Sequence, residues 1–426
     1  MSSKTHPREG LILSLNSGSS SLKISLYRLY DSPASTKPVP SDPIVNPIEL
    51  ILTSSISSIT TSPTFSFSSA SSSDVRTAKD EPLQGNVKDH ATAFAHFLEY
   101  MKNEADIDRK SIAHVCHRIV HGGDYSEPVI INSESYHHIE ALTDLAPLHN
   151  GAALSVIKAS IDELKHANNI AYFDTTFHQD IPAYISSYVI DPKIAKPKGL
   201  RKYGFHGLSY AYIVRTVSQY LQKPPSHTNL ILLHLGSGAS ICAIRNGKSL
   251  DTSMGLTPAS GLPGATRSGD IDPTLIFHYT HRAAKISHDK KGAVDVGVTQ
   301  AEEILNTKAG WSSLVGSSNF AEITAKLDDP SESSPEVENA KLAFEIFVDR
   351  ILNYLGAYYL KLGGDVDALV FSGGIGEKSS ELRAEVAKRC ACLGFAVDEG
   401  KNGEVAEKEG ELEMARECAL EPKFWK

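Results

Sequence analysis

Two short segments about half a chain apart repeat one pattern, and this repeat constrains the fold more than any other feature. Leu11–Gly18 reads LILSLNSG, and Ile231–Gly238 reads ILLHLGSG. Each is an apolar run that ends in a serine–glycine turn and leads into a second, alternating apolar run, which is the pattern of a β-hairpin. A match this short can also arise by chance. Two such hairpins nevertheless favour two domains of one ancestral design.

The length and charge of the chain agree with that organisation. A chain of 426 residues is too long for one ordinary core, so two domains are the natural expectation. The net charge of −9 argues against a nucleic-acid binder that works through a broadly basic surface. The chain contains no run of about 18 apolar residues, so no membrane-spanning helix is expected. The first residues, MSSKTHPREG, lack the apolar stretch of a secretory signal.

The cysteines and histidines indicate neither a disulfide framework nor a zinc site. The cysteines, an odd number without a C-x-x-C pair, are Cys116, Cys242, Cys390, Cys392 and Cys418. The 17 histidines show no metal-binding spacing on one helix face. We therefore expect a reducing, cytoplasmic location.

Helical and strand patterns alternate along the chain and favour an α/β fold. Helices are predicted at 91–104, 208–222 and 338–362, the last as a buried central helix, and strands at Asn229–Leu235 and Ala368–Phe371. Residues 31–48, rich in Pro, Ser and Asp, should form a loop. The Ser/Thr-rich segment 49–73 is compatible with a disordered linker and equally with edge strands that have a polar outer face.

Two glycine-containing turns could bind a nucleotide. NSGSSSLK, from Asn16 to Lys23, is either a plain hairpin turn or a phosphate cradle, in which backbone N–H groups and hydroxyls face the anion. It is neither a Walker loop nor a Rossmann fingerprint. In FSGGIGEKSSELR, Gly373, Gly374 and Gly376 follow a predicted strand and precede a helix that begins near Ser379. Such glycines suit a loop that packs its backbone against a base or ribose.

Two arginines lie beside glycines in predicted loops. Arg118 lies in HRIVHGGDY, and Arg267 lies in GLPGATRSGDIDP. A guanidinium held in a glycine-rich loop can bind phosphate with two hydrogen bonds. The alternative for Arg267 is a surface arginine paired with Asp270 or Asp272.

An aspartate and a histidine complete the candidate chemistry. Asp174 is the first polar residue after the apolar strand in YFDTTFHQD, a position suited to binding Mg²⁺ or polarising a nucleophile. His206 lies between Phe205 and Gly207 in a loop, where it is either functional or structural. Together with the glycine turns and loop arginines, these groups suit phosphoryl transfer, which needs positioning and charge neutralisation.

Eight motifs occur in an order that resembles the acetate kinase (acetokinase) family. They are NSGSSSLK, HRIVHGG, APLHN, FDTTFH, YGFHG, HLGSGAS, TRSGDIDP and FSGGIGE, and they extend over nearly the whole chain. The resemblance implies two related ribonuclease H-like α/β domains of the actin/Hsp70-like type, with ATP bound in the interdomain cleft. The implied N-terminal domain comprises residues 1–175 and about 408–426, and the C-terminal domain comprises residues 176–407.

The resemblance also implies the reaction ATP + acetate ⇌ ADP + acetyl phosphate, by direct in-line transfer with Mg²⁺ or Mn²⁺. A homodimer is expected through the C-terminal domain, with no nucleic-acid or membrane partner. The alternatives are a kinase that uses pyrophosphate or another donor, a propionate or butyrate kinase, and a non-catalytic nucleotide-binding member of the superfold.

Site residues carry over from the family motifs as follows. Arg118 and Arg267 are implied to hold the acetate carboxylate and the moving phosphoryl group, His206 its equatorial oxygens, and Asp174 the carboxylate or the magnesium. The pocket for the acetate methyl corresponds to Val120, Leu148, Phe205 and Pro258. The phosphate-binding positions are Ser19, Ser21 and Lys23 in the first hairpin and His234, Gly236, Ser237 and Gly238 in the second. The adenosine loop corresponds to Gly374, Ile375 and Gly376, and the metal ligands to Asn16 and either Glu409 or Glu411.

Four departures from the family pattern concern mainly the nucleotide side. Ser237 replaces the asparagine of HLGNG, and Ala321, in SSNFAEI, replaces an arginine. Tyr210 replaces the last histidine of YGFHGTSH, and Gly151 replaces the proline of HNP. The first two predict a changed nucleotide affinity or phosphoryl donor.

Overall fold

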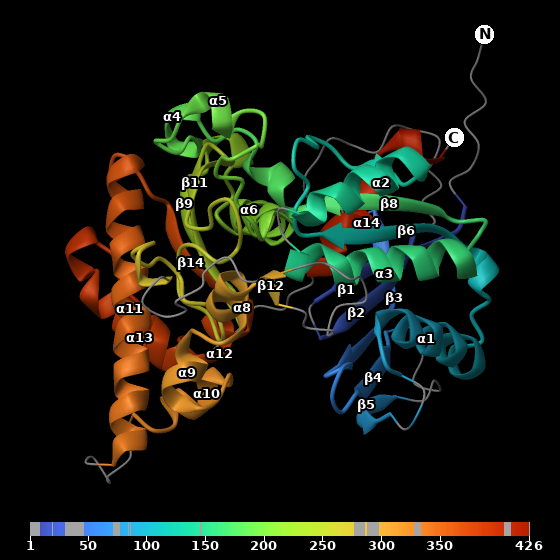
Figure 1. Ribbon diagram of the computed structural model, residues 1–426, viewed down its shortest axis with the longest axis horizontal. Helices are drawn as coiled ribbons and strands as arrows, with labels where there is room; N and C mark the ends of the chain where they lie inside the picture. The colour runs from blue at the N-terminus through green and yellow to red at the C-terminus, as the bar shows by residue number, and fades with distance from the viewer. Residues whose placement is uncertain are drawn as a thin grey trace. The chain divides into compact units, whose positions relative to one another are not determined.

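The chain forms two compact units in the computed structural model. The structure describes residues 9–18, 20–29, 47–70, 77–83, 85, 87–144, 147–276, 286–287, 298–327, 334–403 and 410–425. Unit 1 contains the described residues up to Thr176 and those from Gly410 onward, and unit 2 contains those from Phe177 to Gly403. Both units combine a sheet with helices (Figure 1), so the predicted α/β class is confirmed. Most of the predicted loop 31–48 lies outside the described residues.

Unit 1 is built on an eight-stranded sheet with the order β5-β4-β3-β2-β1-β6-β8-β7. The strands are β1 (Leu11–Ser17), β2 (Leu22–Leu29), β3 (Ile48–Ser57), β4 (Thr64–Ser69), β5 (Ala78–Pro82), β6 (Ile112–Ile119), β7 (Val129–Ile130) and β8 (Asn168–Phe173). Strand β1 pairs antiparallel with β2, as the first hairpin predicts, and parallel with β6, which pairs parallel with β8. The carboxyl ends of β1, β6 and β8 therefore meet at one edge of the sheet.

The Ser/Thr-rich segment forms β3 and β4, so a disordered linker is wrong for its described part. The expectation of edge strands is also wrong, because β5 is the edge and β3 and β4 lie inside the sheet. The reason is the alternation of apolar and hydroxyl side chains. Ile56, Phe65 and Phe67 are buried on one face, where the Phe65 ring lies 4.7 Å from the Tyr100 ring.

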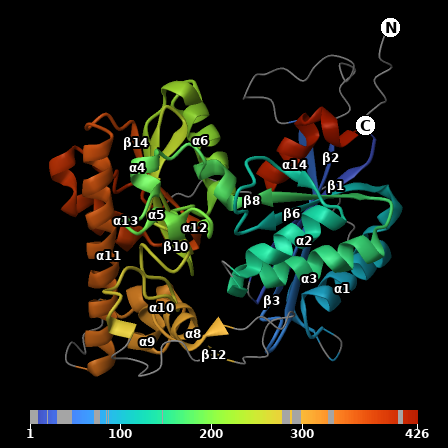
Figure 2. The ribbon, with the colours of Figure 1, turned by 45° about the horizontal axis from the view of Figure 1, so that its top comes forward.

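Helices cover both faces of the unit 1 sheet (Figure 2). The helices are α1 (His90–Ala105), α2 (Ser133–Ala141), α3 (Pro147–Glu163) and α14 (Gly410–Leu420). Phe94 and Phe97 of α1 pack with Leu13 and Leu15 of β1 in one buried cluster. Helix α14 contacts β1, β2 and β6. Its buried Cys418 faces Cys116, and burial raises the pKa of the Cys116 thiol. All five cysteines are free, as predicted.

Unit 2 repeats the central strand order of unit 1. Its main sheet has the order β11-β10-β9-β14, which matches β3-β2-β1-β6 in both order and direction. The strands are β9 (Leu230–Leu235), β10 (Ala239–Arg245), β11 (Lys248–Thr252) and β14 (Ala368–Ser372), with a separate pair β12 (Ile286–Ser287) and β13 (Val298–Thr299). The second predicted hairpin is therefore present, and the two hairpins occupy equivalent places in their sheets.

Unit 2 includes the helices α4 (Ala183–Ser186), α5 (Pro192–Ala195), α6 (Gly207–Tyr220), α8 (Gln300–Thr307), α9 (Trp311–Val315), α10 (Phe320–Thr324), α11 (Pro335–Lys361), α12 (Gly373–Lys378) and α13 (Ser380–Arg389). Helices α6 and α11 are the two that the sequence predicts there. The expectation of a buried central helix is wrong for α11, because only one of its faces is buried and residues such as Leu342 and Leu360 are exposed. Across the described residues, no helix is both long and apolar enough to cross a membrane.

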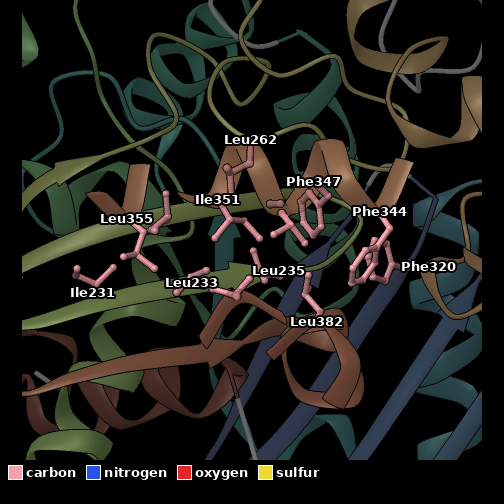
Figure 3. Packing of buried hydrophobic residues seen from close by; sticks show 14 of the residues in the cluster. Ile231, Leu233, Leu235, Leu262, Phe320, Phe344, Phe347, Ile351, Leu355 and Leu382 are labelled. Carbon is pink, nitrogen blue, oxygen red and sulfur yellow. The ribbon is translucent and has the colours of Figure 1, made fainter. Parts of the chain in front are cut away.

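Alternation along β9 buries both faces of the unit 2 sheet. Ile231, Leu233 and Leu235 pack against α11 (Figure 3). Leu230 and Leu232 point to the opposite face and pack with α6. A strand covered on both faces reads as the nearly continuous apolar run that the sequence shows. His234 has the same parity as Leu232, so it lies on the α6 side of the sheet.

His114 in β6 gives the stability of unit 1 a dependence on pH. Its side chain is 2 % exposed, and within the described structure neither ring nitrogen has a hydrogen-bond partner. Burial lowers its pKa from about 6.5 to about 4. Between these values the unfolded chain binds the proton and the folded chain does not, so the free energy of unfolding falls as the pH falls through this window.

We expect His114→Phe to remove this contribution. Urea titrations at pH 5, 6 and 7 should show a slope of unfolding free energy against pH that is smaller by up to one proton, or about 1.4 kcal/mol per pH unit. Stability at pH 7 should be unchanged or higher, because phenylalanine buries no unpaired polar atom. His117→Phe is the comparison variant, and its slope should fall as well, because burial lowers the pKa of His117 to about 4. It should destabilise at pH 7, because His117 Nε2 bonds Asn169 Oδ1 at 2.8 Å. An unchanged slope in His114→Phe would contradict this account.

Candidate active site

The carboxyl ends of β1, β6 and β8 bring Asn16, Arg118 and Asp174 together in unit 1, and Arg118 lies in β6, so its expected loop position is wrong. Arg118 Nε and Nη2 donate to the two carboxylate oxygens of Asp174 at 3.1 and 2.6 Å, and Nη1 donates to Asn16 Oδ1 at 3.0 Å. Asp174 directly follows β8, as predicted, and is fully buried. The Arg118 side chain is 23 % exposed. Three acceptors thus fix a guanidinium that still reaches the surface of the unit.

The first hairpin places Lys23 on the same face as Asn16. The two residues are directly opposite each other in the antiparallel pair β1–β2, and such partners share a face. Lys23 is exposed there. The Gly18 amide donates to the Ser21 carbonyl at 2.8 Å and closes the turn. Ser19 lies outside the described residues.

His90 contacts this turn from α1, and the sequence did not indicate it. It is the first residue of α1, it is buried, and its Nε2 lies 2.8 Å from the Gly18 carbonyl oxygen. A carbonyl only accepts, so Nε2 carries the hydrogen. Burial lowers the pKa of His90, which keeps the ring neutral. The turn is therefore held by a buried side chain as well as by its own backbone.

The residues expected to form the acetate pocket divide between the units. Val120 follows β6 and is half-buried, and Leu148 lies in the first turn of α3, where its side chain is outside the described part. In unit 2, Phe205 and Pro258 are buried. Val120 and Leu148 are therefore described within unit 1, and Phe205 and Pro258 within unit 2.

His206 is the N-cap residue directly before α6 and has a left-handed conformation, with φ of 59°. Its Nδ1 lies 2.8 Å from Ser240 Oγ on β10. Its ring stacks on that of His234, with 4.2 Å between the centroids and 26° between the planes. His234 Nδ1 in turn lies 2.9 Å from Ser209 Oγ. The structure thus brings His206 and His234 together on the α6 side of the unit 2 sheet.

His178 holds the backbone just before His206 and was also not indicated by the sequence. Its Nε2 lies 2.9 Å from the Phe205 carbonyl oxygen, and its Nδ1 lies 2.7 Å from Ser249 Oγ. Gly204 has φ of 81°, and a Cβ there would lie 2.6 Å from the His178 ring. Glycine at 204 therefore lets the loop pass close to the histidine that fixes it.

The predicted second phosphate loop, residues 234–238, packs against the loop of Arg267. The Ala265 amide donates to the Ser237 carbonyl at 2.8 Å, and the Gly236 amide donates to the Gly238 carbonyl at 3.1 Å. A Cβ on Gly238 would lie 2.7 Å from Arg267 Nη1. The guanidinium thus lies against the glycine turn, and any side chain at 238 would displace it.

Asp270 and Asp272, the alternative partners of Arg267, make bonds of their own. Asp270 Oδ1 accepts from the Gly261 amide at 2.7 Å, and Oδ2 accepts from the Tyr354 hydroxyl. Asp272 Oδ1 accepts from the amide and hydroxyl of Thr274. Asp270 therefore anchors the loop that carries Arg267.

The predicted adenosine loop is a helix, so the expectation of a loop is wrong. Gly373, Gly374, Ile375 and Gly376 belong to α12, which directly follows β14, and the helix expected near Ser379 is α13. Gly373 has φ of 79°, and a Cβ there would lie 2.4 Å from the Leu235 carbonyl oxygen. Only glycine permits α12 to begin this close to the end of β9. The segment therefore lies next to the predicted second phosphate loop.

The departures from the family pattern differ in their surroundings. Ser237 and Ala321 are exposed. A Cβ on Gly151 would meet no atom within 4 Å. Tyr210 is fully buried, with its hydroxyl 2.5 Å from Ser240 Oγ. Only the tyrosine is built into a hydrogen-bonded interior.

The side chains at the unit 1 edge offer oxygen donors. In the part of the chain that the structure describes, no group of three or more His, Cys, Asp or Glu side chains is placed to hold a metal ion. The amide oxygen of Asn16 and the carboxylate of Asp174 are the ligand types that Mg²⁺ prefers. Glu409 lies outside the described residues, and Glu411 is placed in α14 by its backbone only.

We expect Asp174→Asn to lower the free energy of unfolding by about 1.5–3 kcal/mol, because it removes charge-assisted hydrogen bonds to a partly buried guanidinium. Asp180→Asn is the matched control. Asp180 pairs with Lys248 at 3.0 Å with both side chains exposed, and such pairs contribute about 0–1 kcal/mol. Urea unfolding followed by circular dichroism measures both. Equal losses in the two variants would show that the Arg118–Asp174 pair is not structural.

Comparison with known proteins places this geometry in a family. The acetokinase family model matches residues 11–417. The chain is 47 % identical to a probable acetate kinase of Emericella nidulans, over 93 % of this chain and 88 % of that protein. It resembles the crystal structure of a propionate kinase from Francisella tularensis with a TM-score of 0.76 at 30 % identity, over 96 % of this chain and 98 % of the other. It resembles Porphyromonas gingivalis acetate kinase with a TM-score of 0.74 at 29 % identity, over the same shares. With its motifs, its sheets and these matches in agreement, the chain belongs to the acetokinase family.

Proposed function

We propose that this chain carries out the acetate kinase reaction of its family by direct in-line transfer of the γ-phosphoryl group of ATP to acetate. An acetate oxygen forms the new bond to phosphorus while the bond to the β-phosphate oxygen breaks, which gives acetyl phosphate and ADP. The observation that carries the proposal is the Arg118 guanidinium, held by Asp174 and Asn16 and still reaching the surface of unit 1. Such a group binds a carboxylate or phosphoryl oxygens without reorganising.

In this mechanism the two arginines and His206 neutralise the transferring group. Arg118 orients the acetate carboxylate, and Arg267, packed against Gly238, contacts the phosphoryl oxygens. His206 donates to an equatorial oxygen. Phosphoryl transfer depends on positioning and charge stabilisation, so these groups need no covalent step.

The glycine turns are assigned to the nucleotide. Ser19, Ser21 and Lys23 of the first hairpin and His234, Gly236, Ser237 and Gly238 of the second would hold phosphates, and Gly374, Ile375 and Gly376 of α12 would contact the adenosine. Mg²⁺ or Mn²⁺, when bound, supplies further neutralisation of the phosphates. Asn16 and either Glu409 or Glu411 would hold that ion, and the oxygen chemistry at Asn16 and Asp174 supports this.

Two alternatives concern the substrates. One of the similar solved structures is named a propionate kinase, so the acceptor acid could be longer than acetate. Ser237 and Ala321 are exposed where the family has longer side chains, so the donor could be pyrophosphate instead of ATP. One assay separates these possibilities.

The hydroxamate assay for acyl phosphate tests donor and acceptor together. We expect product with ATP and acetate and none with pyrophosphate. Because one methylene in a small apolar pocket is worth about 1–3 kcal/mol, kcat/KM should fall about 5- to 150-fold from acetate to propionate and again to butyrate. A preference for pyrophosphate or for a longer acid would replace the proposed substrates. The absence of acyl phosphate with every donor would exclude a kinase.

Arg267→Ala provides the catalytic control in that assay. Loss of a guanidinium that stabilises transferring charge should lower kcat about 10³-fold with a modest change in KM for the nucleotide. Retention of kcat would make Arg267 a structural loop residue.

We also propose a homodimer formed through unit 2. Tyr184, Val189, Ile190 and Ile194 expose large apolar side chains along one segment of unit 2, and apolar surface of this kind is typical of interfaces. Sedimentation equilibrium should give twice the chain mass of 46.1 kDa. Replacing Val189 and Ile194 with aspartate should give a monomer, and a monomeric parent chain would exclude the dimer.

A further inference from the structure

A buried chain of hydroxyl groups leads from Tyr210 to His206. The Tyr210 hydroxyl lies 2.5 Å from Ser240 Oγ, and Ser240 Oγ lies 2.8 Å from His206 Nδ1. Tyr210 is on α6, Ser240 is on β10, and His206 is the N-cap residue of α6. Three side chains from two elements thus form one hydrogen-bonded line that ends on the imidazole.

The two hydroxyl-bearing residues of this chain are sealed from solvent. Tyr210 and Ser240 are each 0 % exposed. Hydrogen bonds are stronger in such surroundings, and neighbouring bonds in a chain polarise one another. The direction in which the hydrogens point is therefore set by the protein groups and not by exchange with water.

The acidities of the groups set that direction. Ser240 has one hydrogen, so it donates either to His206 Nδ1 or to the Tyr210 oxygen. A phenol, with a pKa of about 10, is a far stronger donor than an aliphatic hydroxyl, and an imidazole nitrogen is a good acceptor. The favoured order is Tyr210 donating to Ser240 and Ser240 donating to His206. Nδ1 is then the acceptor, and Nε2 carries the ring hydrogen.

We propose that Tyr210 and Ser240 are positioning residues that hold His206 as the neutral Nε2–H tautomer, the form that donates to the transferring phosphoryl group. The assignment of the donor role rests on the proposed function, whereas the tautomer itself does not. Tyr210 stands where the family commonly has a histidine, and in this chain the side chain bonded to Ser240 there is a phenol. The arrangement also disfavours the doubly protonated ring, because Nδ1–H would require Ser240 to reverse its bond.

The stacked ring of His234 also favours a neutral His206 ring. With the two centroids 4.2 Å apart, two positive rings would repel each other. His234 Nδ1 faces the Ser209 hydroxyl, so this ring is also paired with a neutral group. His206 is thus contacted by the Ser240 hydroxyl, which the Tyr210 phenol bonds in turn, and by a second imidazole.

Nitrogen-15 NMR of the full-length chain labelled at histidine tests the tautomer directly. Resonances lost in His206→Gln identify the ring. We expect an unprotonated Nδ1 and a protonated Nε2 in the parent chain. In Tyr210→Phe the two nitrogens should move toward averaged shifts, because Ser240 can then either donate or accept. A protonated Nδ1 in the parent chain, or unchanged shifts in Tyr210→Phe, would overturn the proposal.

Kinetics of matched variants test the consequence. Tyr210→Phe and Ser240→Ala should each lower kcat about 10-fold, the loss expected for one hydrogen bond, with KM for ATP and acetate nearly unchanged. Ser240→Thr, which keeps the hydroxyl, should retain more activity than Ser240→Ala. Tyr212→Phe is the control, because Tyr212 lies on α6 outside the chain of hydroxyls. Equal kcat in Tyr210→Phe and Tyr212→Phe would overturn the positioning role. Should the parent chain make no acyl phosphate, the proposed function fails, while the NMR result still decides the tautomer.

Discussion

The arrangement of unit 1 depends on the buried charge of Asp174. A carboxylate with no exposure to water must keep a cationic partner, and Asp174 has the Arg118 guanidinium on both of its oxygens. That pair requires β8 to end beside β6, and the bond from Arg118 to Asn16 extends the requirement to β1. The sheet register and the candidate site are therefore specified by one set of contacts.

Unit 2 has the same strand order, but its candidate site residues include histidines where unit 1 has an arginine. An arginine is charged at every relevant pH, so unit 1 needs only to orient it with an opposite charge. The charge and tautomer of a histidine depend on its neighbours. His206 is bonded to the neutral hydroxyl of Ser240, and its stacking partner His234 is bonded to the neutral hydroxyl of Ser209. The charged pair of unit 1 thus lies on β6 and after β8, beside the first hairpin, whereas in unit 2 Ser240 of the equivalent hairpin bonds a histidine.

The sequence correctly predicted those helices and hairpins whose apolar pattern lies within one short segment. Helices α1, α6 and α11 and both hairpins follow from apolar periodicity within each segment. The Ser/Thr-rich segment could not be decided in the same way, because its serines are equally common in linkers and in half-polar strands. The packing of Phe65 against Tyr100 explains why this segment forms strands and not a linker. Helix α12 was missed because three glycines suggest a loop, whereas Gly373 is needed for the close approach to Leu235.

Motif residues such as Arg118, Asp174 and His206 could be named from the sequence, but the histidines that support the turns could not. His90 and His178 bond the carbonyl oxygens of Gly18 and Phe205, at sequence separations of 72 and 27 residues. A backbone carbonyl has no sequence signature, so the sequence does not show which side chain bonds it, even though His178 lies within the FDTTFH motif. Glycine-containing turns have high conformational freedom, and a buried donor on their backbone restricts it. At these two turns, each histidine therefore acts as a hydrogen-bond donor that keeps the backbone in one conformation.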